Sequence, residues 1–306
     1  MGLCLASVFG LIVGIGRLSS NWLVNKLATL YVEVLRNIPP LVIIIFFGAA
    51  VFTYGPLPIF SEAKEIKLPG TDNNLLMLSN ERIGIPSIFG NANMGLYWIL
   101  LALAVVAVFA VRRWRQSVND KTGAPDRKLL WSLGTFFGIA ILGYIALGRP
   151  FSMSWPALSE NRRLVENGFT TNSGYWSLTL ALALYTGSHL AEIIRGSIQA
   201  VAKGQSEASN ALALSGFQRY RFVILPQALR IAIPSGINQF LNLVKNTSLG
   251  TVVAFPEITA LVKTLIGNGK PALEGIAVAM LIYLSFSLAI SAILNVVNNK
   301  LQIVGR

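Results

Sequence analysis

The sequence predicts an all-α integral membrane protein with six full spans and a short helix at its N-terminus. The chain is 54% apolar and only 12% charged, and its mean hydropathy is +0.61. Soluble domains hold about 25% charged residues, so this chain lacks the surface charge that keeps a domain in water. The spans are expected to be helical because lipid forces backbone polar groups to find partners within the segment.

The first apolar stretch, Met1 to Gly16, ends before the first charged residue, Arg17. No basic residue precedes it, which distinguishes it from a secretory signal peptide. It falls short of the roughly 20 residues that cross the hydrocarbon layer. We therefore expect a short helix that resembles the later part of a span.

Six longer apolar segments follow. The first is interrupted at Pro39-Pro40, because proline removes a backbone donor and kinks or restarts a helix. No internal repeat separates the segments, so we expect one membrane domain over 1–306, with its core at about 1–54 and 175–300. A variable helix pair and outward-facing loops occupy about 55–174. The predicted spans are 27–52, 95–111, 129–147, 175–194, 231–253 and 275–297.

Basic residues orient these spans. If Arg17 and Lys26 are cytoplasmic, the alternation of spans places fifteen Lys and Arg residues inside and eight outside. Cytoplasmic loops carry such an excess of Lys and Arg, whereas acids contribute little to orientation. The loops 55–94 and 149–174 then face outward. Among the counted residues, Arg127 and Arg306 are assigned to the inside and Arg163 to the outside.

Composition also excludes several functions. A net charge of +12 would suggest nucleic acid for a soluble chain, but here the membrane orientation accounts for it, so no nucleic-acid partner is expected. Cys4 is the single cysteine and His189 the single histidine. An intramolecular disulfide and a Cys- or His-rich metal site are therefore excluded, and we expect no cofactor.

The inner loop between the spans 175–194 and 231–253 is amphipathic. Ser206 is a candidate N-cap for a helix that places small and apolar residues on one side. Ser215-Gly216 is a candidate break, and Pro226 marks the return toward the membrane. Two interpretations stay open on physical grounds: a docking surface for a cytoplasmic partner, or a helix that lies on anionic lipid.

This loop carries a family resemblance. The run Glu207-Ala208-Ser209, followed by Ala213, Val223 and Leu225-Pro226, resembles the EAA loop of ABC importer permeases. Three further stretches extend the resemblance to the polar, general L-amino-acid branch of that family: RLSSNWLVNKLATLYVEVLRNIPPLV, YTGSHLAEIIRGSIQAVAKGQSEAS and LPQALRIAIPSGINQFLNLVKNTSL. The resemblance covers about residues 5–54 and 175–300.

The resemblance implies a type I ABC importer transmembrane domain in a bacterial inner membrane. It implies a second permease subunit, two ATP-binding subunits, a periplasmic solute-binding protein and an amino-acid substrate. The EAA loop would be the coupling helix seated in the ATPase, with Glu207 and Ala208 at the contact. At Ala213 the family has glycine, and since alanine suits a helix better, we expect the break to move to Gly216. The residues assigned to coupling are Gly204, Glu207, Ala208, Ser209, Ala213 and Gly216.

The chain has no nucleotide motif of its own. LSGFQ at 214–218 superficially resembles the signature of ABC ATPases, but no GxxxxGK[ST] loop accompanies it, and GNGKP at 267–271 lacks the spacing. ATP is therefore expected on separate subunits.

Polar residues within the spans predict a translocation path. Lys245 lies within the span 231–253, and a charge at that depth usually faces a cavity or a partner. The alternative is a structural hydrogen-bond network or a lysine that reaches the interface. Arg36 either pairs with Glu33, three residues earlier, or meets a substrate carboxylate. The residues assigned to the path are Arg36, Asn238, Asn242, Lys245 and Asn246.

Two other functions remain as alternatives. An importer permease for another small solute would share the EAA loop, because that loop indicates a partner ATPase but does not indicate the substrate. A secondary transporter usually has two related halves, which this sequence lacks. A membrane enzyme is not predicted, since no acid is placed to orient His189 in a catalytic set.

Overall fold

The computed structural model describes residues 1–122, 128–162 and 165–301, so that Arg127, Arg163 and Arg306 lie outside the described residues. The chain divides into two compact units. Unit 1 comprises Met1–Ile59, Ser79–Arg82 and Thr171–Arg306, and unit 2 comprises Phe60–Leu78 and Ile83–Thr170. Each unit is described by itself.

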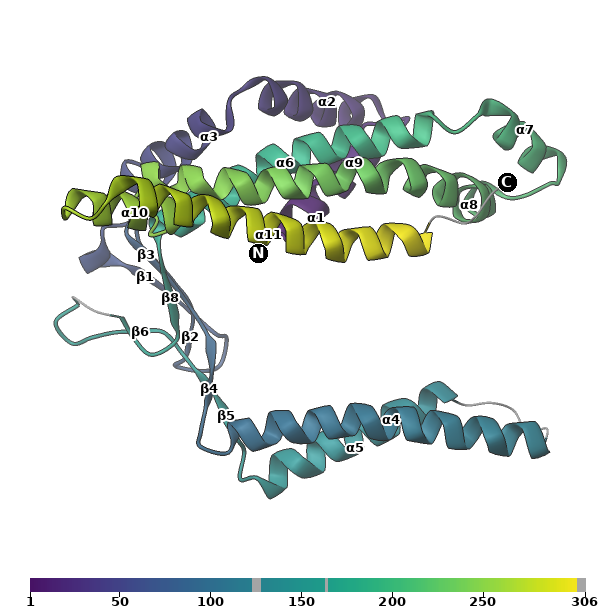
Figure 1. The fold of residues 1–306 in the computed structure, drawn as a ribbon, viewed down its shortest axis with the longest axis horizontal. Helices are drawn as coiled ribbons and strands as arrows, with labels where there is room; N and C mark the ends of the chain where they lie inside the picture. Colours follow the sequence, from purple (N-terminus) through teal and green to yellow (C-terminus); the bar gives the residue numbers. More distant parts are fainter. Residues whose placement is uncertain (123–127, 163–164, 302–306) are drawn as a thin grey trace. The chain divides into compact units, whose positions relative to one another are not determined.

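Unit 1 is a helical bundle (Figure 1). Its α-helices are α1 (Gly2–Gly16), α2 (Trp22–Asn37), α3 (Pro40–Phe46), α6 (Ser173–Gln199), α7 (Lys203–Ala211), α8 (Gly216–Arg219), α9 (Leu225–Asn246), α10 (Ile258–Gly267) and α11 (Ala272–Leu301). Two π-helical segments, η1 (Phe47–Thr53) and η3 (Tyr220–Ile224), and one 3₁₀ segment, η4 (Thr247–Val253), extend them.

The helices agree with the predicted number of spans. In the described part of the chain, four helices are long and apolar enough to cross a membrane, namely α4 (Met94–Thr122), α5 (Lys128–Ala146), α6 and α11. Two bent pairs bring the number to six. One pair turns by 106° between Asn37 and Pro40, where Pro39 is extended and Pro40 starts α3, which confirms the predicted interruption. The other pair joins Gly216–Val253 to Ile258–Gly267 at 47°.

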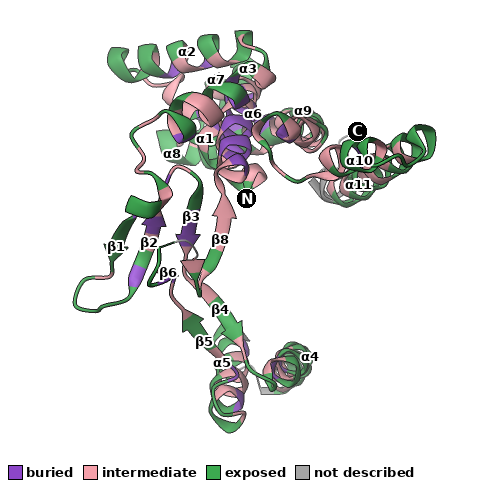
Figure 2. Ribbon diagram, turned by 90° about the vertical axis from the view of Figure 1, so that its left-hand side faces the viewer, coloured by how far each residue is buried: buried purple, intermediate pink, exposed green. Residues whose placement is uncertain are grey.

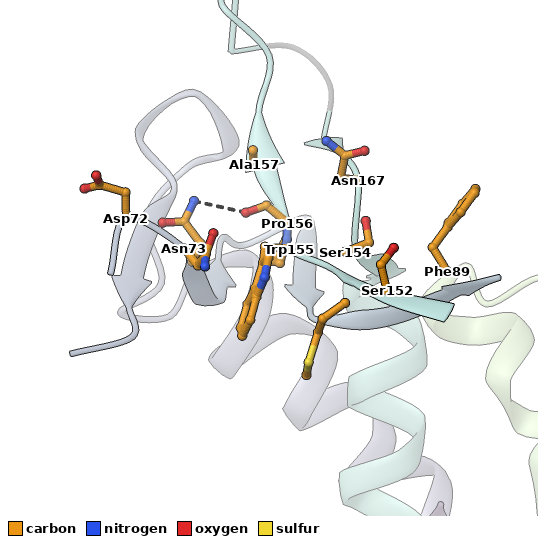
Figure 3. A pocket seen from close by; sticks show the side chains of 11 residues that line it. Asp72, Asn73, Phe89, Ser152, Ser154, Trp155, Pro156, Ala157 and Asn167 are labelled. Carbon is orange, nitrogen blue, oxygen red and sulfur yellow. Dashed lines mark hydrogen bonds between the residues drawn. The ribbon is translucent and has the colours of Figure 1, made fainter. Parts of the chain in front are cut away.

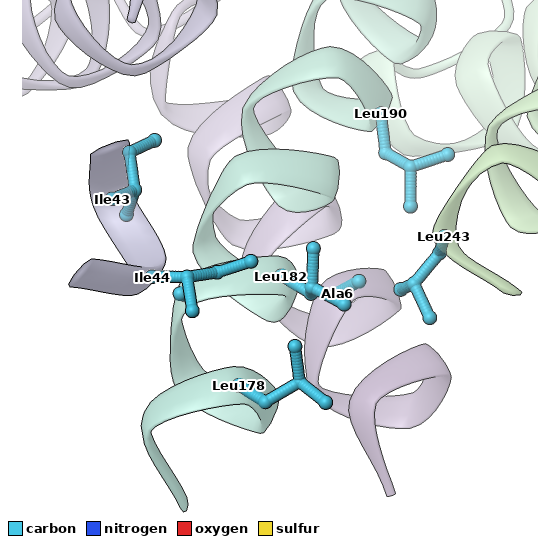
Figure 4. Close-up of a cluster of buried hydrophobic side chains, with 8 residues drawn as sticks. Ala6, Ile43, Ile44, Leu178, Leu182, Leu190 and Leu243 are labelled. Carbon is cyan, nitrogen blue, oxygen red and sulfur yellow. The ribbon is translucent and has the colours of Figure 1, made fainter. Parts of the chain in front are cut away.

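The core of unit 1 forms around α6. Leu178 and Leu182 of α6 pack with Ile44 of α3 and Leu243 of α9 in one cluster of buried side chains (Figure 4). Most buried residues of α6 are small or hydroxyl-bearing. In Figure 2, where buried residues are purple, buried chain gathers around α6. Small residues allow helices to approach closely in membranes, where lipid offers no hydrophobic drive for helix association.

Glycines set the distance between α1 and α6. A Cβ atom added at Gly10 would lie 2.6 Å from Leu190 Cβ, and one at Gly14 would lie 3.0 Å from the Ala191 carbonyl oxygen. On the facing side, a Cβ at Gly187 would lie 3.0 Å from Phe9 Cβ. Although α1 has only 15 residues, it packs closely along α6.

Unit 2 holds the helix pair α4 and α5 together with short strands, two of which include residues assigned to unit 1. The strands are β1 (Lys64–Lys67), β2 (Asn74–Leu78), β3 (Arg82–Ile85), β4 (Ser87–Gly90), β5 (Phe151–Ser154), β6 (Ala157–Leu158), β7 (Val165–Glu166) and β8 (Phe169–Asn172), and η2 (Phe60–Glu62) is a 3₁₀ turn. β1, β2, β3 and β8 form one sheet in that order, with β1–β2 and β2–β3 antiparallel. β4 pairs with β5, and β6 pairs with β7.

The strands add to the all-helical prediction. Residues 55–94 and 149–174 were expected to be polar loops, and the structure gives them strand pairs instead of irregular chain. Short runs such as Asn74–Leu78 do not alternate clearly between apolar and polar residues, so their pairing is not visible in the sequence.

Candidate functional site

The loop between α6 and α9 forms two short helices at one end of unit 1 (Figure 1). α7 begins at Lys203, three residues before the predicted N-cap Ser206, so that prediction was wrong. Ala202 has an extended backbone and starts the helix with no side-chain cap. Its carbonyl accepts a hydrogen bond from Gln205 N at 2.9 Å, which places Ser206 inside the helix.

Ala213 takes the conformation that favours glycine, with φ of 51°. Its N–H donates to the Asn210 carbonyl at 2.9 Å, and Leu214 N donates to the Ser209 carbonyl at 3.1 Å. These two bonds form the Schellman motif that ends many helices. The predicted shift of the break to Gly216 was therefore wrong, because the bonds hold Ala213 in place in spite of its Cβ.

Gly216 instead opens the next helix. Ser215 caps α8 in a capping box, in which its hydroxyl accepts from Gln218 N at 3.3 Å and Gln218 Oε1 accepts from Ser215 N at 2.9 Å. This arrangement satisfies two donors at the helix start. The break between α7 and α8 therefore consists of a helix stop at Ala213 and a helix start at Ser215.

The exposed surface of this loop is partly apolar and partly charged. Gly204, Glu207 and Ala208 are exposed, whereas Ser209 is buried and its hydroxyl donates to the Ser206 carbonyl at 2.8 Å. Glu207 and Ala208 are therefore accessible to a partner, while the Ser209 hydroxyl is hydrogen-bonded within α7. Large apolar side chains project nearby, at Leu212, Phe217, Tyr220 and Phe222.

Side-chain bonds tie the loop to the span that follows it. Gln227 of α9 donates to Gln205 of α7 at 3.2 Å, and Arg219 of α8 donates to Asn210 of α7 at 2.8 Å. The first bond links α7 directly to α9, and the second links α7 to α8. The sequence gives no sign of either bond, because the partners lie 22 and 9 residues apart.

The polar residues of α9 lie largely outside the packed core of unit 1. Asn238, Asn242 and Lys245 are exposed and Asn246 is half-buried. Lys245 contributes to a cavity of about 530 Å³. Ser248, Thr259 and Tyr283 also line that cavity. In the described part of the chain, Lys245 has no ion-pair partner.

Arg36 does not pair with Glu33. Its nearest acid is Glu192 of α6 at 4.0 Å, while Glu33 lies 3.8 Å from Arg17. Glu192 also binds Arg17 and accepts from Arg195 at 2.5 and 3.1 Å. One carboxylate thus faces three arginines from three parts of the chain. The Arg36 side chain is 40% exposed, so it remains accessible to a further anion.

Unit 2 contains a polar pocket of about 500 Å³ (Figure 3). Ser152, Ser154 and Asn167 line it with Asp72, Trp155 and others. The buried Asn74 amide donates to the Pro156 carbonyl at 3.0 Å. None of the residues predicted for coupling or for the path lines this pocket.

Unit 1 defines a class of protein: a helical membrane component with several spans and an exposed helical loop outside them. Comparison with known proteins gives the family. Binding-protein-dependent transport system inner membrane components match residues 128–303. The chain belongs to this family.

The similar relatives are amino-acid permeases. The chain is 36% identical to the general L-amino acid transport system permease protein AapQ of Rhizobium johnstonii, over 100% of the chain and 74% of that protein. It is 36% identical to the putative amino-acid ABC transporter permease YhdX of Escherichia coli, over 98% and 74%. It is 33% identical to the glutamate/glutamine/aspartate/asparagine permease BztB of Rhodobacter capsulatus, over 94% and 72%.

A solved structure has the same fold. The crystal structure of an amino acid ABC transporter with histidines aligns with a TM-score of 0.53 at 17% identity, and covers 98% of this chain and 86% of that one. This likeness supports the helical fold of the chain.

Proposed function

We propose that this chain is the membrane-spanning permease subunit of an ATP-driven importer for polar L-amino acids. The observation that carries the proposal is its similarity, over almost its whole length, to permeases named for general L-amino acids and for glutamate, glutamine, aspartate and asparagine. The assembly would contain a second, different permease subunit, two ATP-binding subunits and a periplasmic solute-binding protein in a bacterial inner membrane.

The α7–α8 loop is the proposed contact with the ATP-binding subunit. Its exposed Glu207 and Ala208 are polar and small, and Phe217 and Phe222 offer apolar area beside them. The hydrogen bond between Gln205 and Gln227 would carry motion of α7 to α9. This chain would bind no nucleotide, and ATP would stay on the partner subunits.

The exposed polar face of α9 is the proposed wall of the translocation path. Asn238 and Asn242 offer both donors and acceptors, and Lys245 lacks an acid partner in the described residues. A zwitterionic or acidic amino acid needs a cation for each carboxylate, which Lys245 and the accessible Arg36 supply. Asn246, half-buried beside Lys245, completes this face.

Reconstituted transport tests the proposal. The complex is placed in proteoliposomes with the binding protein outside and ATP inside, and uptake of labelled glutamate and glutamine is followed. We expect uptake that needs both ATP and the binding protein. Uptake driven by an ion gradient after removal of the ATP-binding subunits would support a secondary transporter instead. Failure with amino acids but success with another solute would support an importer of different specificity.

A matched pair of variants tests the path itself. Lys245→Met should lower glutamate uptake about tenfold, the effect of losing one charge-assisted hydrogen bond of about 1.4 kcal/mol. Lys263→Met, which removes an exposed lysine from α10 that does not line the cavity, should leave uptake unchanged. Equal uptake by both variants would remove Lys245 from the path.

A further inference from the structure

Three arginines cluster on α4 where its apolar part ends. Arg112, Arg113 and Arg115 follow the apolar run that begins at Met94. Arg112 lies 18 residues beyond Met94, which corresponds to about 27 Å along a helix. The hydrocarbon layer is about 30 Å thick, so this distance places the arginines near the level of the lipid headgroups.

Two of these arginines are held in place by α5. Arg112 Nε donates to Ser132 Oγ at 2.8 Å. The Arg115 guanidinium lies 5.1 Å from the centre of the Trp131 ring and 5.9 Å from that of Trp114. Cation–π contacts and the hydrogen bond orient both guanidinium groups before any ligand arrives.

The cluster keeps unused donors and positive charge. None of the three arginines forms an ion pair in the described residues. Arg115 Nε is buried without a hydrogen-bond partner, so a ligand would meet the terminal nitrogens of that guanidinium group. The acid nearest in the described sequence is Asp120, which Lys121 follows. Guanidinium groups donate in a planar fork that matches phosphate oxygens, so the chemistry favours a phosphate-bearing anion.

The surroundings favour a lipid phosphate over a free one. Apolar side chains are exposed along both helices, at Leu103, Val106 and Phe109 of α4 and at Leu130 and Leu142 of α5. Trp114 and Trp131 are 58% and 48% exposed. Such tryptophans mark the membrane interface. A ligand with acyl chains would cover the apolar faces while its headgroup met the arginines.

We propose that Arg112, Arg113 and Arg115, with Trp114 and Trp131, bind the phosphate of an anionic phospholipid. Phosphate oxygens accept from the terminal guanidinium nitrogens of Arg112 and Arg115, and Arg113 adds positive charge. The acyl chains lie along the apolar faces of α4 and α5. The site requires membrane insertion but does not depend on which solute the protein carries.

Lipid retention by the purified complex tests this site. The complex is stripped of lipid, incubated with phosphatidylglycerol or phosphatidylcholine, and analysed by native mass spectrometry. We expect about tenfold more retention of the anionic lipid, because basic residues near a membrane surface attract anionic headgroups. Equal retention of the two lipids would overturn the proposal. Displacement of bound lipid by millimolar inorganic phosphate would also overturn it, because the site would then take free phosphate.

Charge-preserving variants separate a built site from simple orientation by positive charge. Arg112→Lys/Arg115→Lys keeps the charge but loses the planar fork, and should lower the preference for phosphatidylglycerol to about twofold. Trp131→Phe should lower the preference for phosphatidylglycerol less. This variant tests the site if the double-lysine variant does not fold. Arg149→Lys, beyond the other end of α5, is the matched control and should retain the wild-type preference. A double-lysine variant that binds like the wild type would overturn the proposal.

Discussion

α6 and the α4–α5 helix pair both have the length and hydropathy of membrane spans, but they are built differently. In its most apolar stretch, α6 has a mean hydropathy of 1.2 and is 61% buried. The corresponding stretches of α4 and α5 have mean hydropathies of 2.5 and 1.8 and are 11% and 17% buried. The most buried of these helices is therefore the least hydropathic.

This difference in hydropathy and burial arises because a membrane span is surrounded by lipid instead of water. In water, leucine and valine are driven into a core, whereas in lipid they gain nothing by leaving the surface. α6 gathers Ala181, Ala183, Thr186, Gly187 and Ser188 at its contacts, because small residues bring helices close. The exposed valines and leucines of α4 and α5 face outward within their own unit.

The largest expected effect lies at the charged contact of α6. Glu192→Ala removes the carboxylate that binds Arg17, whose side chain is only 10% exposed. Arg17 then keeps only the longer contact with the exposed Glu33 at 3.8 Å, and this loss of its main partner costs about 3 kcal/mol. We expect a lower midpoint of thermal unfolding in detergent. Glu33→Ala is the control, because Glu33 is 62% exposed, and should change stability by less than about 0.5 kcal/mol.

Glycine-to-alanine substitutions test the comparison, because they are expected to lower stability in α1 and to raise it in α5. Gly10→Ala places a methyl group 2.6 Å from Leu190 Cβ, and should cost about 1–3 kcal/mol by forcing α1 away from α6. At Gly134 of α5 an added Cβ meets no atom within 4 Å. Gly134→Ala should therefore raise stability, by up to about 1 kcal/mol, because alanine favours the helix. Equal effects would show that the two regions pack alike.

A smaller effect is expected at the turn between α7 and α8. Ala213→Gly relieves the cost of a left-handed alanine, about 1 kcal/mol, while adding freedom to the unfolded chain. We expect a net gain below about 1 kcal/mol and slower amide exchange at residues 212–215. Ala211→Gly, within α7, should instead lower stability by about 1 kcal/mol. Faster exchange in Ala213→Gly would contradict the observed turn.

The sequence was sufficient for features that depend on local properties. The apolar runs located the spans, Pro39-Pro40 located the bend before α3, and the inner loop was recognised from Glu207 to Pro226. Each of these follows from hydropathy or from backbone chemistry within a few residues.

The remaining features depend on partners distant in sequence. Glu192 binds Arg17, which lies 175 residues away in the sequence. The sequence therefore could not show that Glu33 lies near Arg17 instead of pairing with the local Arg36. The strands of unit 2 pair across connections that leave no periodic signal. The prediction that the helix break moves from Ala213 to Gly216 was wrong because it depended on the helix preference of alanine alone. Two hydrogen bonds that end α7 outweigh that preference.

The central claim is that the α7–α8 loop couples this permease to a separate ATPase. Stimulated ATP hydrolysis by the reconstituted complex tests it most directly, with Glu207→Ala compared with Glu274→Ala, which removes an exposed acid from the first turn of α11. The account predicts that Glu207→Ala lowers stimulation by substrate-loaded binding protein about tenfold, the loss of one charge-assisted contact. Docking of the binding protein should persist, and Glu274→Ala should behave as wild type. Full stimulation in Glu207→Ala would contradict the claim.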